Sequence, residues 1–355
     1  MTRPPSLAAA AALLFALIAT RASAFSWFGS GATATATPAP TSSLSLTHSI
    51  SATPTPTRTA TRTPSPKATP APLARQVVGG EFDFIASDHT SFSKIGSRFG
   101  IGPKLLAREN GKQVTDKVNE GDTIRIDNRH VVPLELTTGI IINLPQRMVF
   151  HFENERITGA FPAAIGRPEK KWQTLTGAFK VIQLREDPTW RVPASIQDEM
   201  EAEGKDVVDE VDPGPDNPLG KFWIGLSLPV LGIHGTNRPL SIYSYRTHGC
   251  IRLHPDDIEA LYEAVDYNEP GEIVYLPLMV ARLDDGQVFL ESQRDIYRRG
   301  TGGIDAVRSL AEANHIDNLI DWTKAESVIN EMDGIARDVT FTPVNGAANA
   351  TGAAK

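Results

Sequence analysis

The sequence predicts a mainly β, sandwich-like domain in the middle of the chain, preceded by a small α+β unit. Two observations predict this. Short apolar runs separated by turn residues dominate residues 138–277, where only one strong helical pattern occurs. Residues 77–134 instead show the order strand, helix, helix, strand. The chain has 355 residues, 41% of them apolar, which is enough for two or three compact units.

The N-terminal part has the pattern of a leader followed by a linker. Residues 1–24 combine Arg3, an apolar run and the small-residue cleavage site Ala22-Ser23-Ala24, as in a cleavable signal peptide. The apolar run is short for a bilayer, so we expect no stable membrane span; an uncleaved anchor is the alternative. Residues 25–76 are rich in Thr, Ser, Pro and Ala, which predicts a disordered linker that serves as a tether or a simple spacer.

The small unit at residues 77–134 has apolar residues at helical spacing between two strand-like runs. Phe92, Ile95 and Phe99 share one face of the first predicted helix, and Pro103 suits the first position of the second. The predicted elements are a strand over 82–86, a helix over 91–99, a helix from 103, and a strand over 123–126.

The pattern of residues 138–277 predicts several strands and one strong helix. The helix is predicted over 255–265, where Ile258, Leu261, Tyr262 and Val265 recur at helical spacing. A charged, Pro-rich segment at 185–217 contains a short helix pattern over 196–202. The predicted strands are 140–144, 148–152, 178–184, 222–226 and 273–276.

The C-terminal part, residues 278–344, is predicted to form a small unit of its own. A hairpin is expected over 282–291 around Asp284-Asp285-Gly286, and an amphipathic helix over 325–335. Residues 345–355 are predicted to be a disordered tail.

Charge and motif content exclude several classes of function. The first 80 residues have six basic and no acidic residues, so the remainder has 29 basic and 42 acidic residues, a net charge of −13. An acidic folded region argues against nucleic acid as a partner. No Cys/His spacing fits a zinc site and no glycine-rich phosphate loop occurs, so we expect neither a metal nor another cofactor.

Cys250 is the only cysteine of the chain, and His234 lies sixteen residues before it. A lone thiol is either a small buried apolar group or a nucleophile. Cysteine and histidine together suit acyl transfer, because the imidazole manages the thiol proton while the thiolate attacks a carbonyl. Glycines flank both residues, as expected where backbone approaches a substrate. These residues predict a cysteine-dependent acyltransferase.

The residues around this pair resemble the L,D-transpeptidase family of the YkuD type. The resemblance rests on two segments, Ile233-His234-Gly235-Thr236-Asn237 and Arg246-Thr247-His248-Gly249-Cys250-Ile251-Arg252, and covers about 138–277. Pro213-Gly214-Pro215-Asp216-Asn217-Pro218-Leu219-Gly220 is similar to a segment of the periplasmic Gram-negative branch (ErfK/YbiS type). In that branch the segment at 185–217 forms a flap over the active site. The alternative to a flap is a surface insertion with no part in catalysis.

The resemblance implies a role for each site residue. Cys250 would be the nucleophile and His234 the base, its ring oriented by the Gly235 carbonyl. His248 would be structural or part of the oxyanion environment, and the Gly249 and Cys250 N–H groups would bind the oxyanion. Arg252 would bind a substrate carboxylate, with a surface salt bridge as the alternative. Thr236 and Asn237 either contact substrate or stabilise their turn.

The unit at 77–134 resembles a LysM module, which binds peptidoglycan glycan. Asn110 and the turn Gly121-Asp122-Thr123 fit that pattern, whereas Asp88-His89-Thr90 replaces the usual Gly-Asp-Thr before the first helix. A degenerate module that only packs against its neighbours is the alternative to one that binds glycan.

Together these features predict a periplasmic peptidoglycan L,D-transpeptidase. Its expected partners are stem peptides, glycan strands and an outer-membrane lipoprotein as one acyl acceptor. With water as the acceptor, the same site would be an L,D-carboxypeptidase or endopeptidase. A non-catalytic wall-binding protein is a further alternative, although intact Cys250, His234, Gly235 and Arg252 argue against it.

Overall fold

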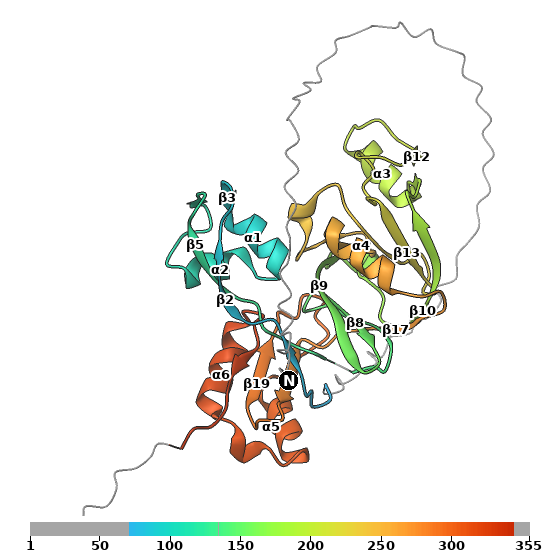
Figure 1. The fold of residues 1–355 in the computed structure, drawn as a ribbon. Coiled ribbons are helices and arrows are strands. Elements are labelled where there is room, and N and C mark those ends of the chain that lie inside the picture. The colour runs from blue at the N-terminus through green and yellow to red at the C-terminus, as the bar shows by residue number, and fades with distance from the viewer. Residues whose placement is uncertain (1–70, 134, 344–355) are drawn as a thin grey trace, which may run out of the picture. The chain divides into compact units, whose positions relative to one another are not determined.

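A computed structural model describes residues 71–133 and 135–343 (Figure 1). The predicted signal peptide at 1–24, most of the predicted linker at 25–76 and the predicted tail at 345–355 lie outside the described residues. Within the described ranges, no helix is both long enough and apolar enough to cross a bilayer.

The central domain is built on a nine-stranded sheet in the order β15-β9-β16-β14-β13-β10-β17-β7-β8, and β8 also pairs with β9. This additional pairing joins the last strand back to the second, so the sheet folds over on itself. The mainly β character predicted for this region is confirmed. The strands are β7 (Gly139–Asn143), β8 (Met148–Glu153), β9 (Arg156–Gly166), β10 (Gly177–Glu186), β13 (Phe222–Leu226), β14 (Gly232–His234), β15 (Tyr245–Thr247), β16 (Ile251–Leu253) and β17 (Pro270–Val274).

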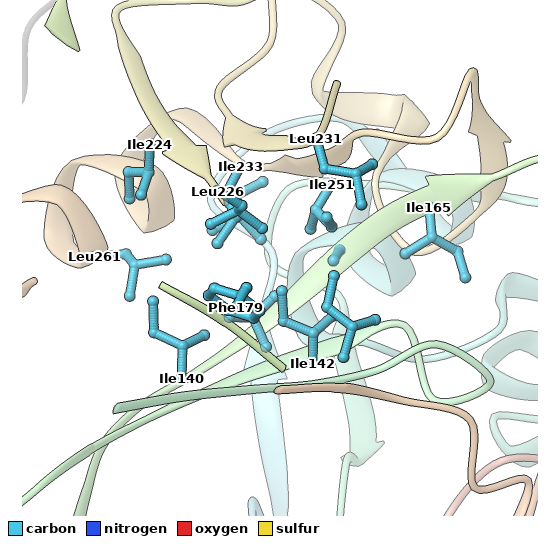
Figure 2. Close-up of a cluster of buried hydrophobic side chains, with 14 of the residues drawn as sticks. Ile140, Ile142, Ile165, Phe179, Ile224, Leu226, Leu231, Ile233, Ile251 and Leu261 are labelled. Atoms are coloured by element: carbon cyan, nitrogen blue, oxygen red, sulfur yellow. The ribbon is translucent and has the colours of Figure 1, made fainter. Parts of the chain in front are cut away.

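Two long strands fold the sheet around its core. The first half of β10 pairs with β17 and its second half with β13, with a register shift between Val181 and Gln183. In the same way β9 pairs first with β8 and then with β16. The apolar residues thereby enclosed include Ile140, Phe179 and Ile233, and Figure 2 shows them facing one another across the fold.

Helix α4 (Pro255–Ala264) closes one side of this core with Ile258 and Leu261. His254 caps its start, because its Nδ1 accepts the Asp256 N–H, and the first turn carries two acidic residues that favour the positive end of the helix. The helix ends one residue before the predicted end, because Val265 has extended backbone.

Residues 81–127 contain the predicted order of strand, helix, helix and strand. These elements are β2 (Glu81–Ile85), α1 (Phe92–Phe99), α2 (Pro103–Glu109) and β5 (Thr123–Asp127), and β2 pairs with β5 antiparallel. Ser91 caps α1 by accepting the Lys94 N–H, and Gly100 ends it with φ 74°, a conformation that favours glycine. Small pairings accompany them: β3 (Thr90–Ser91) with β4 (Lys117–Val118), and β1 (Val77–Val78) with β6 (His130–Val131).

The C-terminal part contains the three-stranded sheet β18 (Leu278–Arg282), β19 (Val288–Ser292) and β20 (Arg337–Asp338), together with α5 (Gly303–Ala313) and α6 (Trp322–Glu331). The predicted hairpin turn around Asp284-Asp285-Gly286 is confirmed, but its first strand, β18, ends at Arg282, where the hairpin was predicted to begin. The helix predicted over 325–335 is wrong at both ends, because Asp321 caps α6 earlier and Met332 ends it with φ 46°. Helix α5 was not predicted.

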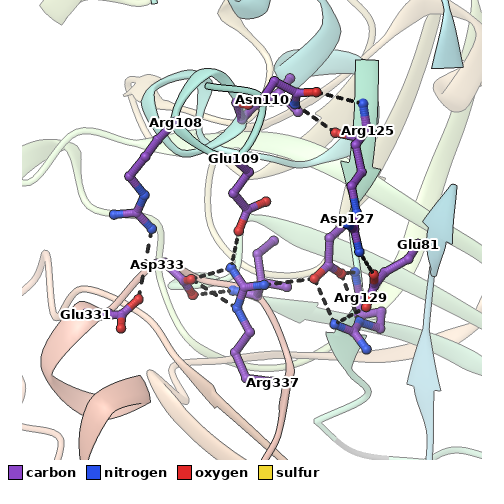
Figure 3. A network of polar contacts seen from close by, with 12 residues as sticks. Glu81, Arg108, Glu109, Asn110, Arg125, Asp127, Arg129, Glu331, Asp333 and Arg337 are labelled. Carbon is purple, nitrogen blue, oxygen red and sulfur yellow. Dashed lines mark hydrogen bonds and ion pairs between the residues drawn. The ribbon is translucent and has the colours of Figure 1, made fainter. Parts of the chain in front are cut away.

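Ile335, beyond the end of α6, is fully buried among core residues of the N-terminal unit. Arg337 follows it and forms ion pairs with Asp333, Glu109 and Asp127 (Figure 3). The C-terminal segment therefore completes the packing of residues 77–133, although the predicted domain boundaries place the two parts far apart in the chain.

An arm of the chain, residues 187–221, runs between β10 and β13. It contains the pairing of β11 (Trp190–Arg191) with β12 (Glu210–Val211), and helix α3 (Ala194–Ala202), which has no buried residue. The predicted helix over 196–202 is confirmed with an earlier start. The 3-10 turns of the fold are η1 (Lys170–Trp172), η2 (Pro239–Ser241) and η3 (Asp317–Leu319).

Candidate active site

Strands β14 and β16 bring the predicted site residues together. They pair in parallel, with Ile233 opposite Ile251 and His234 opposite Arg252. Partners in register point their side chains to the same face of a sheet, so His234 and Arg252 lie side by side. Cys250 directly precedes β16, and the Gly232 N–H lies close enough to stabilise its thiolate. His234 and Cys250, sixteen apart in sequence, thus belong to neighbouring segments of the sheet.

Cys250 is half-buried at the end of a tight loop. Gly249 has φ 121°, which requires glycine, and its N–H donates to Thr247 Oγ1 over 3.2 Å. The Thr247 hydroxyl also donates to the Cys250 carbonyl over 2.6 Å. Because the Gly249 N–H is engaged inside the loop, it is less available as an oxyanion donor than the sequence suggested. The Cys250 thiol itself donates to the Val230 carbonyl over 3.7 Å.

A chain of hydrogen bonds supports this loop from the opposite side. Thr174 Oγ1 donates to the Gly249 carbonyl over 2.7 Å and accepts the Gly166 N–H over 2.9 Å. The Tyr297 hydroxyl donates to the Gly166 carbonyl over 2.7 Å. Tyr297 lies beyond the predicted end of the domain at 277, yet it packs into the central core.

The His234 ring is buried and held in one tautomer. Its Nδ1 lies 2.7 Å from the Gly235 carbonyl oxygen, which can only accept, so Nδ1 carries the proton and Nε2 is free to accept one. The Trp223 ring stacks on the imidazole, with centroids 6.0 Å apart and planes at 21°. Burial, and to a smaller extent the Arg252 charge, lower the pKa of His234 from 6.5 to about 3. Hydrogen bonds with the backbone of Gly235 and Leu219 raise this pKa, but their effect is smaller.

The resting pair is therefore neutral. Burial raises the pKa of the Cys250 thiol, although the Gly232 N–H and the Arg252 charge oppose the effect. A raised pKa of the thiol and a lowered pKa of the imidazole both disfavour a thiolate–imidazolium ion pair. The imidazole is then suited to act as a general base when a substrate arrives, rather than as a standing counter-ion for the thiolate.

Arg252 has no acidic partner in the part of the chain that the structure describes. Its Nη1 donates to Ser241 Oγ over 2.9 Å, and its buried Nε has no hydrogen-bond partner. Among residues 71–133 and 135–343, no carboxylate oxygen lies within 4.0 Å of its guanidinium. Burial and the nearby charge of Arg238 lower the pKa of Arg252. The surface salt bridge considered for this residue is absent from the described part of the chain.

Residues 137–276 match the family described as the L,D-transpeptidase catalytic domain, YkuD. The chain contains an L,D-transpeptidase domain. It is similar to the probable L,D-transpeptidase ErfK/SrfK of Escherichia coli K12, with 26% identity over 64% of this chain and 74% of that protein. The probable L,D-transpeptidase YcfS of the same strain is 27% identical over 64% of this chain and 72% of that protein.

A solved structure, L,D-transpeptidase 3 from Mycobacterium tuberculosis, is 16% identical over 44% of this chain and 75% of that chain. Its TM-score of 0.31 is too low to support a structural argument.

In the L,D-transpeptidase domain, the His248 ring is bound to the arm. Its Nε2 lies 2.8 Å from Glu199 Oε2 on α3 and 2.6 Å from Arg167 Nη2. Trp172 meets the imidazole edge-on, with centroids 4.4 Å apart. The hydrogen bond from His248 lowers the pKa of Glu199. These contacts favour a positioning role for His248 over an oxyanion role.

Thr236 makes a contact within its own turn, whereas Asn237 bonds to the arm. Thr236 Oγ1 accepts the Arg238 N–H over 2.9 Å, and the Asn237 amide donates to the Asp216 carbonyl over 2.9 Å. Both also line a polar pocket of about 250 Å³ beside Lys221. The turn-stabilising alternative is therefore present, and a contact with substrate remains a prediction.

Four residues that contact or support the candidate site were not predicted from the sequence: Trp223, Glu199, Thr174 and Tyr297. Only Trp223 had a sequence signal, because Gly225 and Gly232 lie near it on β13 and β14 and leave room for a large side chain. A Cβ atom at Gly232 would lie 2.4 Å from the indole. Among the described residues no group of three or more His, Cys, Asp or Glu side chains could hold a metal ion.

Proposed function

We propose that Cys250 of this L,D-transpeptidase domain attacks the third-residue carbonyl of a peptidoglycan tetrapeptide stem and expels the terminal D-alanine. The pairing of β14 with β16 supports the proposal, because His234 and Arg252 are partners in it and Cys250 directly precedes β16. The similarity to two probable L,D-transpeptidases of Escherichia coli supports the same reaction.

In the first half-reaction Arg252 binds a carboxylate of the donor stem, for which its free N–H groups are suited. The thiol leaves the Val230 carbonyl and gives its proton to His234 Nε2 as sulfur attacks. The Cys250 N–H stabilises the oxyanion. His234 then protonates the departing D-alanine amine, which leaves a thioester on Cys250.

In the second half-reaction an amine attacks the thioester and restores the thiol. The amine belongs to the diamino acid of another stem or to a lysine of an outer-membrane lipoprotein. His234 can take the amine proton in this step because its Nδ1 is bound to the Gly235 carbonyl and its Nε2 is left to accept a proton.

The experiment is mass spectrometry of purified tetrapeptide stems incubated with the protein, with and without an amine acceptor. Cross-linked product together with released D-alanine is expected, and Cys250→Ala should give neither. Cleavage by water alone, even at high acceptor concentration, would replace transpeptidation by carboxypeptidase activity. Product formation by Cys250→Ala would contradict the proposed nucleophile.

We also propose that residues 77–133 are a LysM-like module that contacts glycan, and that the protein works in the periplasm after removal of its leader. The antiparallel β2–β5 pair with α1 and α2 between them supports the first point. The test is co-sedimentation of full-length Cys250→Ala with glycan strands stripped of their stems. Binding is expected, and its absence would leave the module a packing unit only.

A further inference from the structure

An apolar pocket shares one wall with His234 and another with Cys250. It has a volume of about 290 Å³, and its lining includes Ile182, Gln183, Trp223, Gly225, Val230 and Leu231. Trp223 is the residue that stacks on the imidazole, and the Val230 carbonyl accepts the thiol hydrogen. The pocket therefore adjoins the candidate site through Trp223 and Val230.

The Trp223 wall is built by two glycines. A Cβ atom at Gly232 would come within 2.4 Å of the indole, and one at Gly225 within 3.0 Å of its Nε1. Neither glycine has a positive φ, so backbone strain does not account for them. Their lack of side chains allows the indole to lie against β13 and β14. Figure 2 shows Leu226 and Leu231 on these segments, directed toward the core.

The Val230 wall is strained and exposed. Val230 has φ 59°, a conformation that a β-branched residue rarely adopts, and its side chain is 89% exposed. Ile182, on the other rim, is 47% exposed. Two large aliphatic side chains of the pocket lining thus remain exposed to solvent, and one of them, Val230, belongs to the residue that accepts the thiol hydrogen.

The charges around the site separate two kinds of ligand. The pocket lining contains no ionisable side chain. The cations of the site lie elsewhere: Arg252 with Arg238 nearby, and Lys221 at the polar pocket. A donor stem rich in carboxylates is suited to the cationic side, whereas the apolar pocket is suited to an uncharged hydrocarbon chain.

We propose that this pocket is the acceptor subsite, and that it holds the methylene stem of the amine-bearing side chain that attacks the thioester. The inference rests on the proposed acyl transfer. An apolar pocket also favours the neutral form of an amine, which is the nucleophilic form. The amine nitrogen bonds to the thioester carbon, the carbon–sulfur bond breaks, and sulfur leaves as thiolate. The amine proton passes to His234 and from there to the thiolate.

The test separates the two half-reactions. The rate of acylation is measured as the release of D-alanine from a soluble tetrapeptide. The rate of aminolysis is measured as product formation with free amino acids of increasing side-chain length, from diaminopropionate to lysine. In the wild-type protein, kcat/KM for the acceptor should rise about fourfold per added methylene. Ile182→Ala should weaken this dependence and lower kcat/KM for lysine about fivefold, with the acylation rate unchanged.

The matched control is Ile85→Ala, which truncates an isoleucine that is 66% exposed on β2. It should change neither half-reaction on these soluble substrates. The inference is overturned if Ile182→Ala behaves like the control, or if it slows acylation instead of aminolysis, which would assign the pocket to the donor. Absence of acylation in the wild-type protein would instead contradict the proposed function itself.

Discussion

Arg252 and Arg337 are both partly buried, but their surroundings are opposite. Three carboxylates surround Arg337: Asp333 at 2.6 Å, Glu109 at 2.5 Å and Asp127 at 2.9 Å (Figure 3). Arg252 has a serine hydroxyl, an unpaired Nε and a second arginine nearby. Burial disfavours charge on both guanidinium groups. At Arg337 the hydrogen bonds and charge of Asp333 and Glu109 outweigh burial and raise its pKa, whereas the pKa of Arg252 is lowered.

The different surroundings distinguish an arginine that stabilises the fold, Arg337, from one that is available to bind a ligand, Arg252. A buried charge without a partner destabilises the fold, so its retention calls for another explanation. At Arg337 the partners come from the N-terminal unit and from its own segment, which ties these parts together. At Arg252 the missing partner is a carboxylate, and the donor stem supplies one.

The largest expected effect tests the structural side of the comparison. Arg337→Leu leaves Glu109 and Asp333 without their cation, while Asp127 keeps its pair with Arg129, so the free energy of unfolding should fall by on the order of 3 kcal/mol. Chemical denaturation measures this change. The exposed Arg125→Ala, which breaks only the pair with Glu81, should leave stability nearly unchanged. Equal effects of the two variants would refute the special role of Arg337.

The second prediction tests the ligand side. Arg252→Lys and Arg252→Ala should lower kcat/KM on a soluble tetrapeptide roughly ten- to a hundredfold, about 1.5–3 kcal/mol, because lysine cannot offer a two-point fork to a carboxylate. Stability should stay the same or rise. If both variants remain within about twofold of wild-type activity, the substrate role of Arg252 is wrong.

The third prediction extends the comparison to the imidazole beside Arg252. The pKa of His234 is about 3 in the folded state and near 6.5 when unfolded, so the unfolded chain binds more protons between these values. Stability should therefore fall as the pH drops below about 6.5, by about 2 kcal/mol at pH 5. Denaturation of wild type and His234→Asn at pH 7.5 and 5 measures this contribution. An identical pH dependence in both proteins would contradict it.

The smallest expected effect concerns the arm. Glu199→Gln removes the charge that bonds to His248 and Arg167, both partly exposed, so kcat/KM should fall by no more than about threefold. Hydrogen exchange across residues 194–202 should become faster. Asp198→Asn, which alters the neighbouring residue of α3, is the control. Unchanged exchange in Glu199→Gln would show that the contact does not hold the arm.

The candidate site residues could be named from the sequence because they lie in two short segments that resemble a known family. Cys250 and Arg252 are two residues apart, so a shared face could be anticipated if the chain is extended there. The main strands and α4 could also be predicted, since their apolar patterns are strong. Strands β14 and β16 are too short to show an apolar alternation, so their parallel pairing could not be predicted.

Other features depend on contacts between distant parts of the chain. The isolation of Arg252 from carboxylates cannot be seen in the sequence, because Asp256 and Asp257 lie only a few residues away. The burial of Ile335 in the N-terminal unit is likewise tertiary, and the apolar spacing up to Ile335 wrongly extended the predicted helix. Tyr297 supports the catalytic loop from beyond the predicted boundary of the domain.

The central claim is that Cys250 forms a covalent acyl intermediate. The direct measurement is intact-protein mass spectrometry after incubation with a carbapenem, whose strained lactam carbonyl is open to attack by a thiol. One adduct is predicted on the wild-type protein, located on the peptide that contains Cys250, and none on Cys250→Ala. An adduct that persists on Cys250→Ala, or a wild-type protein that forms none, would contradict the account.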